Sequence, residues 1–112
     1  MEVIMTVESL DETKLRLKKA FRGQRQGSWI TFASVELMFK VMTVKRWEIV
    51  RTMTGAGPLS IRETARRVGR DVKAVHRDIH ALLDAGIIDR DGDKVVFPYD
   101  AIHLDAKLKA AE

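Results

Sequence analysis

The sequence contains no cysteine and only two prolines. Without cysteine, the chain cannot form a disulfide, use a thiol nucleophile or bind zinc through thiolates, and this composition is typical of a reducing cytoplasm. No stretch approaches the roughly 18–20 apolar residues of a membrane-spanning helix. The opening stretch, MEVIMTVESLDE, lacks the basic segment and the long apolar core of a signal peptide. We therefore expect a cytoplasmic protein with no membrane segment.

Motifs of catalysis are also missing. The GAGP stretch at residues 55–58 lacks the further glycine and the lysine of a phosphate-binding loop. No serine stands in a glycine-flanked elbow, and the carboxylates are spread through turns and helix starts. These absences predict that the protein is not an enzyme and that it has no cofactor.

The charge is distributed unevenly along the chain. Of the 112 residues, 46% are hydrophobic and 32% are charged, which is typical of a globular protein, and the net charge is +4. Residues 45–77 carry nine basic and three acidic side chains, whereas residues 78–112 carry four basic and eight acidic ones. A local basic block of this kind attracts polyanions even when the net charge is small.

The N-terminal part predicts a strand, a helix and a second strand. Residues 2–7 favour a short strand, and Ser9 with Glu12 forms a capping box for a helix that stops at Gly23. This helix carries an apolar stripe of Leu10, Leu17, Ala20 and Phe21. The SWITFAS stretch favours a strand, and Ser34 can cap a helix that runs to about Met42 with Phe39 in its apolar seam.

The remaining chain predicts three helices and a hairpin. Thr43 caps one helix, Ser60 and Glu63 form a second capping box, and Asp71 caps a longer helix. IIDRDGDKVVF favours a β-hairpin, and AIHLDAKL favours a last strand. A short helix, a turn with glycine, a second helix and a hairpin follow one another as in a winged helix-turn-helix. We expect an α+β, mostly α chain with an N-terminal extension at residues 1–27 and a winged helix-turn-helix domain at residues 28–112.

The second helix of this motif has a basic side. Its core stripe is predicted to centre on Val72, Val75 and Ile79, continuing to Leu82 and Leu83. Long cations beside small alanines let a helix approach base edges and phosphates, and arginine can contact guanine with two hydrogen bonds. Basic residues of the preceding helix are placed to meet phosphates. The predicted contacts to double-stranded DNA are Arg62, Arg66, Arg67, Arg70, Lys73, Ala74, Arg77 and His80.

Two patterns suggest metal sites, but neither is complete. His76 and His80 lie one helical turn apart, yet a zinc site needs a third and usually a fourth ligand, and HRDIH lacks the glutamate of metalloprotease helices. The aspartates of DRDGDK are spaced as in a calcium loop, but the glycine is at the wrong position and the flanks favour strands. We expect no bound metal, with His80 packing or donating a hydrogen bond to DNA.

The chain resembles MarR-like winged-helix transcriptional regulators over residues 59–100, LSIRETARRVGRDVKAVHRDIHALLDAGIIDRDGDKVVFPYD. It is most similar to a family of small predicted regulators of archaea and bacteria. The resemblance covers residues 43–105 well, residues 28–42 weakly and residues 1–27 hardly at all. It implies a recognition helix at residues 72–85 and a wing at residues 87–97. The wing tip departs from the usual basic pattern, because three aspartates outnumber Arg90 and Lys94.

Two hypotheses follow for the whole protein. The first is a sequence-specific transcriptional regulator that binds DNA as a homodimer, with the N-terminal helix, alone or with residues 101–108, at the interface. The second is an antitoxin, because some genes of the resembling family lie beside small toxin genes. In that case residues 1–27 would bind the toxin, and the protein would repress its own operon.

Overall fold

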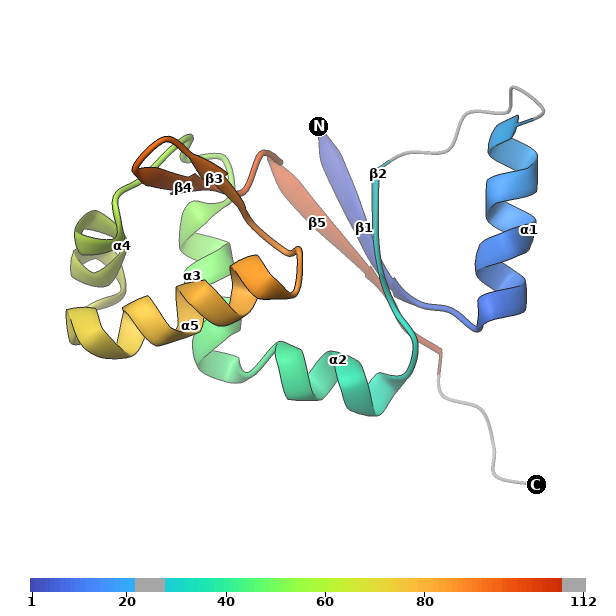
Figure 1. Ribbon diagram of the computed structural model, residues 1–112, viewed down its shortest axis with the longest axis horizontal. Helices are drawn as coiled ribbons and strands as arrows, with labels where there is room; N and C mark the ends of the chain where they lie inside the picture. The colour runs from blue at the N-terminus through green and yellow to red at the C-terminus, as the bar shows by residue number, and fades with distance from the viewer. Residues whose placement is uncertain (22–27, 108–112) are drawn as a thin grey trace. The chain divides into compact units, whose positions relative to one another are not determined.

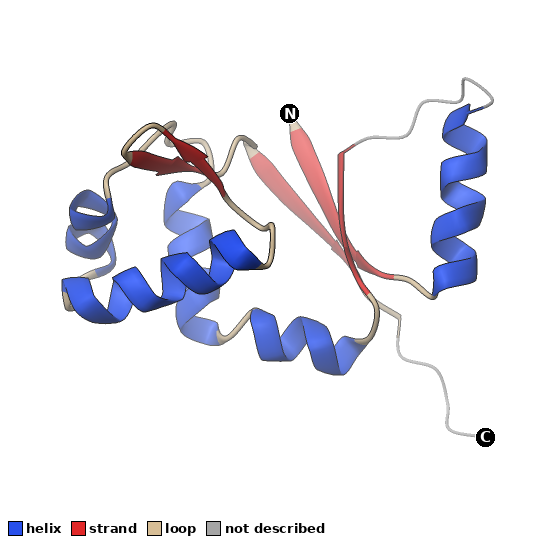
Figure 2. Ribbon diagram, in the orientation of Figure 1, coloured by secondary structure: helices blue, strands red, loops and turns tan. Residues whose placement is uncertain are grey.

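The computed structural model describes residues 1–21 and 28–107, with the side chains of residues 19–21 excepted. The α+β class expected from the sequence is confirmed, since this part of the chain forms five helices and two small sheets (Figures 1 and 2). The elements are, in chain order, β1 (Glu2–Val7), α1 (Leu10–Phe21), β2 (Ser28–Phe32), α2 (Val35–Val41), α3 (Val44–Met53), α4 (Ile61–Val68), α5 (Val72–Asp84), β3 (Asp89–Asp91), β4 (Lys94–Val96) and β5 (Ala101–Asp105).

The chain divides into two compact units, and the boundary falls within α2. The helical unit comprises Met1 and Lys40–Ala101, and the sheet unit comprises Glu2–Phe39 and the residues from Ile102 onward. β2, which the sequence analysis assigned to the DNA-binding part, pairs with β1 and so belongs to the sheet unit. The helix end expected at Gly23 lies outside the described residues. No helix in residues 1–21 and 28–107 is long and apolar enough to cross a membrane.

The sheet unit is built on a parallel pair of strands. β1 and β2 pair from Val3 opposite Ser28 to Val7 opposite Phe32, and β5 is the third strand, in the order β2-β1-β5. The apolar alternation of β1 buries Val3 and Met5 completely. α1 is the connection between the two parallel strands, and Ser9 begins it as expected, because its Oγ accepts a hydrogen bond from the Glu12 backbone N–H at 3.2 Å.

The helical unit packs α3, α4 and α5 around one apolar core. The sequence periodicity of α5 buries Val75, Ile79 and Leu82, and α3 contributes Ile49, Val50 and Met53 to the same unit. Burial of such side chains stabilises the fold by about 1.5–3 kcal/mol each. All three helix starts expected at Thr43, Ser60 and Asp71 are confirmed by side-chain hydrogen bonds to the first turns.

A short hairpin follows α5, as the sequence predicts. β3 and β4 are antiparallel, with Asp91 opposite Lys94, so Gly92 and Asp93 form the turn between them. Gly92 has a φ of 63°, which a glycine adopts without strain. Leu59 adds an isolated antiparallel bridge to Val95, which ties the hairpin to the segment before α4 through two backbone hydrogen bonds of 2.9 Å.

Two apolar residues assigned to a core from the sequence are exposed. Phe39 is 65% exposed and Val72 is 40% exposed. Val72 is the first residue of α5, so the apolar stripe of this helix extends one turn further toward its N-terminus than the packed core does. The N-terminal turn of α5 therefore presents a valine, and not only cations, at the surface.

Candidate nucleic-acid interface

The turn between α4 and α5 is fixed by caps on both sides. Gly69 ends α4 in the left-handed conformation with a φ of 69°, and the Arg70 backbone N–H donates to the Ala65 carbonyl at 3.1 Å. Asp71 then begins α5, because its Oδ2 accepts hydrogen bonds from the backbone N–H groups of Lys73 and Ala74. Three residues thus set the direction of α5 relative to α4.

The N-terminal half of α5 has an exposed surface with unpaired cations. Lys73 and Arg77 are exposed, lie one helical turn apart, and make no ion pair with any residue that the structure describes. Together with Asp71, Val72 and His76 they line a shallow hollow of about 610 Å³, hereafter the α5 hollow. A hollow lined by two unpaired cations and an exposed valine suits a ligand that combines negative charge with apolar groups.

Arg70, which the sequence analysis placed with these cations, lies elsewhere. Its Nη2 donates to Asp78 Oδ2 at 2.9 Å, and only 15% of its side chain is exposed. Arg46 of α3 donates from Nε to Asp78 Oδ1 at 3.1 Å and from Nη1 to the Val41 carbonyl at 3.0 Å. This Asp78 cluster (Arg46, Arg70 and Asp78) connects α3, the α4–α5 turn and the middle of α5.

The electrostatics of the Asp78 cluster favour the ion pairs. Partial burial raises the pKa of Asp78, but the hydrogen bonds from Arg46 and Arg70 outweigh this effect, so the pKa lies below its ordinary value. Nη1 of Arg70 is buried without a hydrogen-bond partner among the described residues, which shows how closely the guanidinium is enclosed. Arg70 is therefore a positioning residue for the two helices, and not part of the exposed basic surface.

The cations of α4 differ in how strongly they are neutralised. Glu63 accepts hydrogen bonds from Arg66, with Nε at 2.9 Å from Oε2, and from Arg67 Nε at 3.2 Å. The hydrogen bonds from Arg66 and Arg67 lower the pKa of Glu63 to about 2. Arg62 is exposed and has no ion pair within the described part of the chain. Of the three arginines predicted on α4, only Arg62 is thus an unpaired cation.

The two histidines of α5 lie against each other. Nε2 of His80 is 3.2 Å from Nε2 of His76, and the ring centroids are 4.2 Å apart. Within residues 1–21 and 28–107, no group of three or more potential metal ligands lies close enough together to hold an ion. His76 is exposed and His80 is half-buried, so His76, and not His80, lines the α5 hollow.

Sequence reasoning missed two residues of this surface. Val72 was assigned to the core and His76 to its edge, but both line the α5 hollow. The available signal was their place in the first two turns of α5, directly after the tight turn that ends α4. The helical wheel reports only the direction around the helix and not the depth along it.

Comparison with known proteins supports the fold. The chain is similar to the crystal structure of a predicted DNA-binding transcriptional regulator from E. coli, with 20% sequence identity, a TM-score of 0.51 and coverage of 82% of this chain and 86% of that one. At this identity the likeness shows a common fold. No curated protein matches the sequence significantly. The HVO_A0114 family model matches residues 41–104, which make up more than half of the chain and include α3 to β4 and most of β5. The protein therefore belongs to the HVO_A0114 family.

Proposed function

We propose that the protein is a sequence-specific DNA-binding transcriptional regulator of the winged helix-turn-helix type. The observation that carries this proposal is the exposed N-terminal half of α5 with its unpaired Lys73 and Arg77. α5 is the second helix of a capped helix–turn–helix and is followed by the β3–β4 hairpin, which is the order of elements in which the second helix enters the major groove. The fold shared with a predicted DNA-binding regulator supports the same function.

Four exposed side chains of the α5 hollow contact DNA in this proposal, while the fifth, Asp71, caps the helix. Arg77 reads a guanine through two hydrogen bonds, and Lys73 contacts a phosphate or a base as a point charge. Val72 packs on a thymine methyl group, and the small Ala74 lets the helix approach the groove. His76 donates a hydrogen bond, while His80 orients its ring from behind at 3.2 Å.

The cations of α4 serve affinity rather than sequence recognition. Arg62, Arg66 and Arg67 contact phosphates, and Arg66 and Arg67 exchange their pairing with Glu63 for the DNA backbone. The hairpin is the wing, and three exposed aspartates lie on β3 and in its turn, so we assign it to packing and not to phosphate contact.

The subtype that we propose is MarR-like, acting as a homodimer. One α5 helix reads a single half-site, and two half-sites provide the specificity that a genome requires. The alternative of an antitoxin that binds a toxin through residues 1–27 is supported by the exposed leucines of α1, which offer a surface to a protein partner.

The proposal is tested by fluorescence anisotropy with a duplex selected from a random pool. Arg77→Ala should weaken binding to the selected duplex by about 1–3 kcal/mol and weaken binding to random duplexes much less. Lys40→Ala, which removes an exposed cation from α2, is the matched control and should change neither affinity. Unchanged binding of the selected duplex by Arg77→Ala would contradict the assignment of α5 as the recognition helix.

A further inference from the structure

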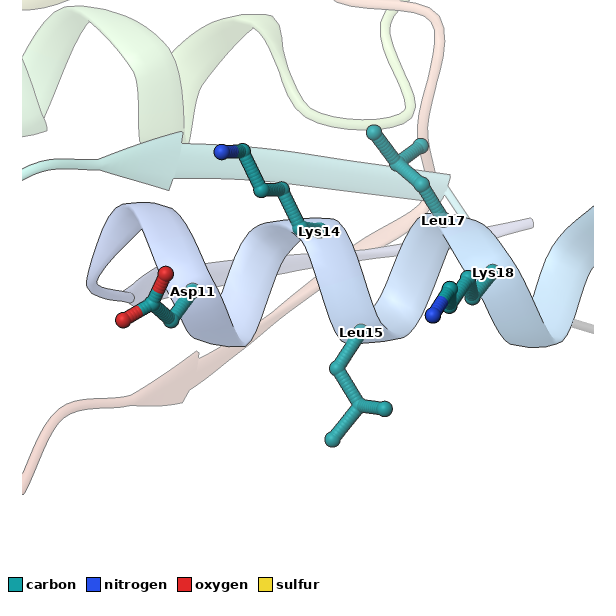
Figure 3. Close-up of a pocket in the computed structure, with 5 residues that line it drawn as sticks. All are labelled: Asp11, Lys14, Leu15, Leu17 and Lys18. Carbon is teal, nitrogen blue, oxygen red and sulfur yellow. The ribbon is translucent and has the colours of Figure 1, made fainter.

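The outer face of α1 carries exposed leucines on both sides of a charged strip and has no partner within the described part of the chain. Leu10 is 69% exposed, Leu15 is 57% exposed and Leu17 is 47% exposed. These leucines flank a strip of charged residues, and Asp11, Lys14, Leu15, Leu17 and Lys18 line a hollow of about 500 Å³ on this side of the helix (Figure 3). Three exposed leucines on twelve residues of helix are typical of an interaction surface and unusual for a face that stays in water.

The inner face of α1 is already occupied, which fixes the orientation of the helix. Arg16 lies over the Trp29 ring at 4.5 Å, and it donates hydrogen bonds to Glu8 at 3.1 Å and to the Thr31 hydroxyl at 3.2 Å. With about 100° between successive residues, Lys14 and Lys18 project on the side opposite Arg16. The charged strip is therefore on the face that points away from the residues that hold α1.

The order of charges along α1 matches a second, antiparallel copy of the same helix. Both acidic residues, Asp11 and Glu12, lie in the first turn, and the cations begin at Lys14 and continue to Lys19. Asp11 and Lys18 are two turns apart on one face, about 5 Å on either side of the midpoint between them. An antiparallel partner places its Lys18 beside Asp11 and its Asp11 beside Lys18, and brings like charges together only at Lys14 near the midpoint. A parallel partner brings like charges together at all three positions.

We infer that α1 pairs with α1 of a second copy of this chain in an antiparallel, isologous contact. Its two-fold axis passes near Lys14 and Leu15, and two Asp11–Lys18 ion pairs flank this axis. The same arrangement brings Leu10 of one copy alongside Leu17 of its partner, which removes both from water. The inference rests on the proposed function only in that two half-sites call for two chains, since the contact itself involves no DNA.

Charge reversal tests the contact without DNA, by sedimentation equilibrium at tens of micromolar protein. Asp11→Lys and Lys18→Asp, each alone, should raise the dimer dissociation constant at least about tenfold, because each places like charges together at both ends of the contact. The double variant Asp11→Lys/Lys18→Asp should restore the dimer, and so should a mixture of the two single variants. Glu36→Lys, the same charge change in the first turn of α2, is the control and should leave the dimer intact.

The rescue excludes a purely structural role of the two residues. Asp11 and Lys18 are seven positions apart and do not touch within one helix, so only a contact between copies lets the second substitution correct the first. Circular dichroism of each variant verifies that the fold is kept. A monomeric unsubstituted protein, or a double variant that stays as weak as the single ones, would overturn the inference. Neither result bears on Arg77, whose DNA affinity is measured separately.

Discussion

Replacement of Asp78 by asparagine removes the negative charge that holds two arginines of different segments. The carboxylate accepts hydrogen bonds from Arg46 at 3.1 Å and from Arg70 at 2.9 Å, and the three side chains are 15–23% exposed. A hydrogen bond to a charged group contributes about 1.5–3 kcal/mol, and a fully buried ion pair that loses one partner costs about 3–5 kcal/mol. Asparagine keeps one acceptor and the site is partly solvated, so we expect a loss of about 2–4 kcal/mol.

Urea denaturation followed by circular dichroism measures this loss. Glu63→Gln is the matched control, because it also removes a carboxylate shared by two arginines. Those arginines are 41–72% exposed, so we expect a smaller loss than for Asp78→Asn. A double-mutant cycle with Arg70→Met should give a coupling free energy of about 1–3 kcal/mol. If Asp78→Asn unfolds within about 0.5 kcal/mol of the unsubstituted protein, the account of the Asp78 cluster is wrong.

Two further predictions concern the same helices. Gly69→Ala should destabilise the protein by about 1–2 kcal/mol in the same denaturation assay, because residue 69 has a φ of 69°, which strains an alanine. An added Cβ would meet no atom within 4 Å, so backbone strain is the only cause, and an unchanged unfolding midpoint would refute this explanation. The pKa values of Asp78 and Glu63 are lowered in the fold, so their stabilisation is complete above the unfolded pKa values near 4 and is lost as the pH falls. The free energy of unfolding should therefore decline below about pH 4, and less steeply for Asp78→Asn than for the unsubstituted protein; equal slopes would contradict the shift.

Local signals in the sequence were sufficient to predict α4, the turn after it, α5 and the hairpin. Ser60, Gly69 and Asp71 act through hydrogen bonds to residues two to four positions away, so their roles follow from spacing alone. The hairpin was also predictable, because the aspartates and Gly92 separate two β-branched runs.

Which side chains are exposed at the interface depends on contacts that the spacing of residues in the sequence does not reveal. Arg70 pairs with Asp78 eight positions further on, and the same carboxylate binds Arg46 from 32 positions away, so the cluster that draws Arg70 away from the exposed face becomes visible only in the fold. Periodicity placed Val72 on the correct side of α5 but gave no measure of how far the core extends along the helix. In the sheet unit, the parallel pairing of β1 with β2 likewise joins segments separated by a whole helix.

Amide chemical-shift mapping with a selected DNA duplex tests the central claim most directly. On titration of DNA into the isotope-labelled protein, we expect the largest shift changes at residues 71–77, with smaller changes at the exposed arginines of α4 and little change in β1. Arg77→Ala should reduce these changes at the same DNA concentration, and Lys40→Ala should not. Shift changes concentrated in the sheet unit, with residues 71–77 unaffected, would contradict the proposal that α5 reads DNA.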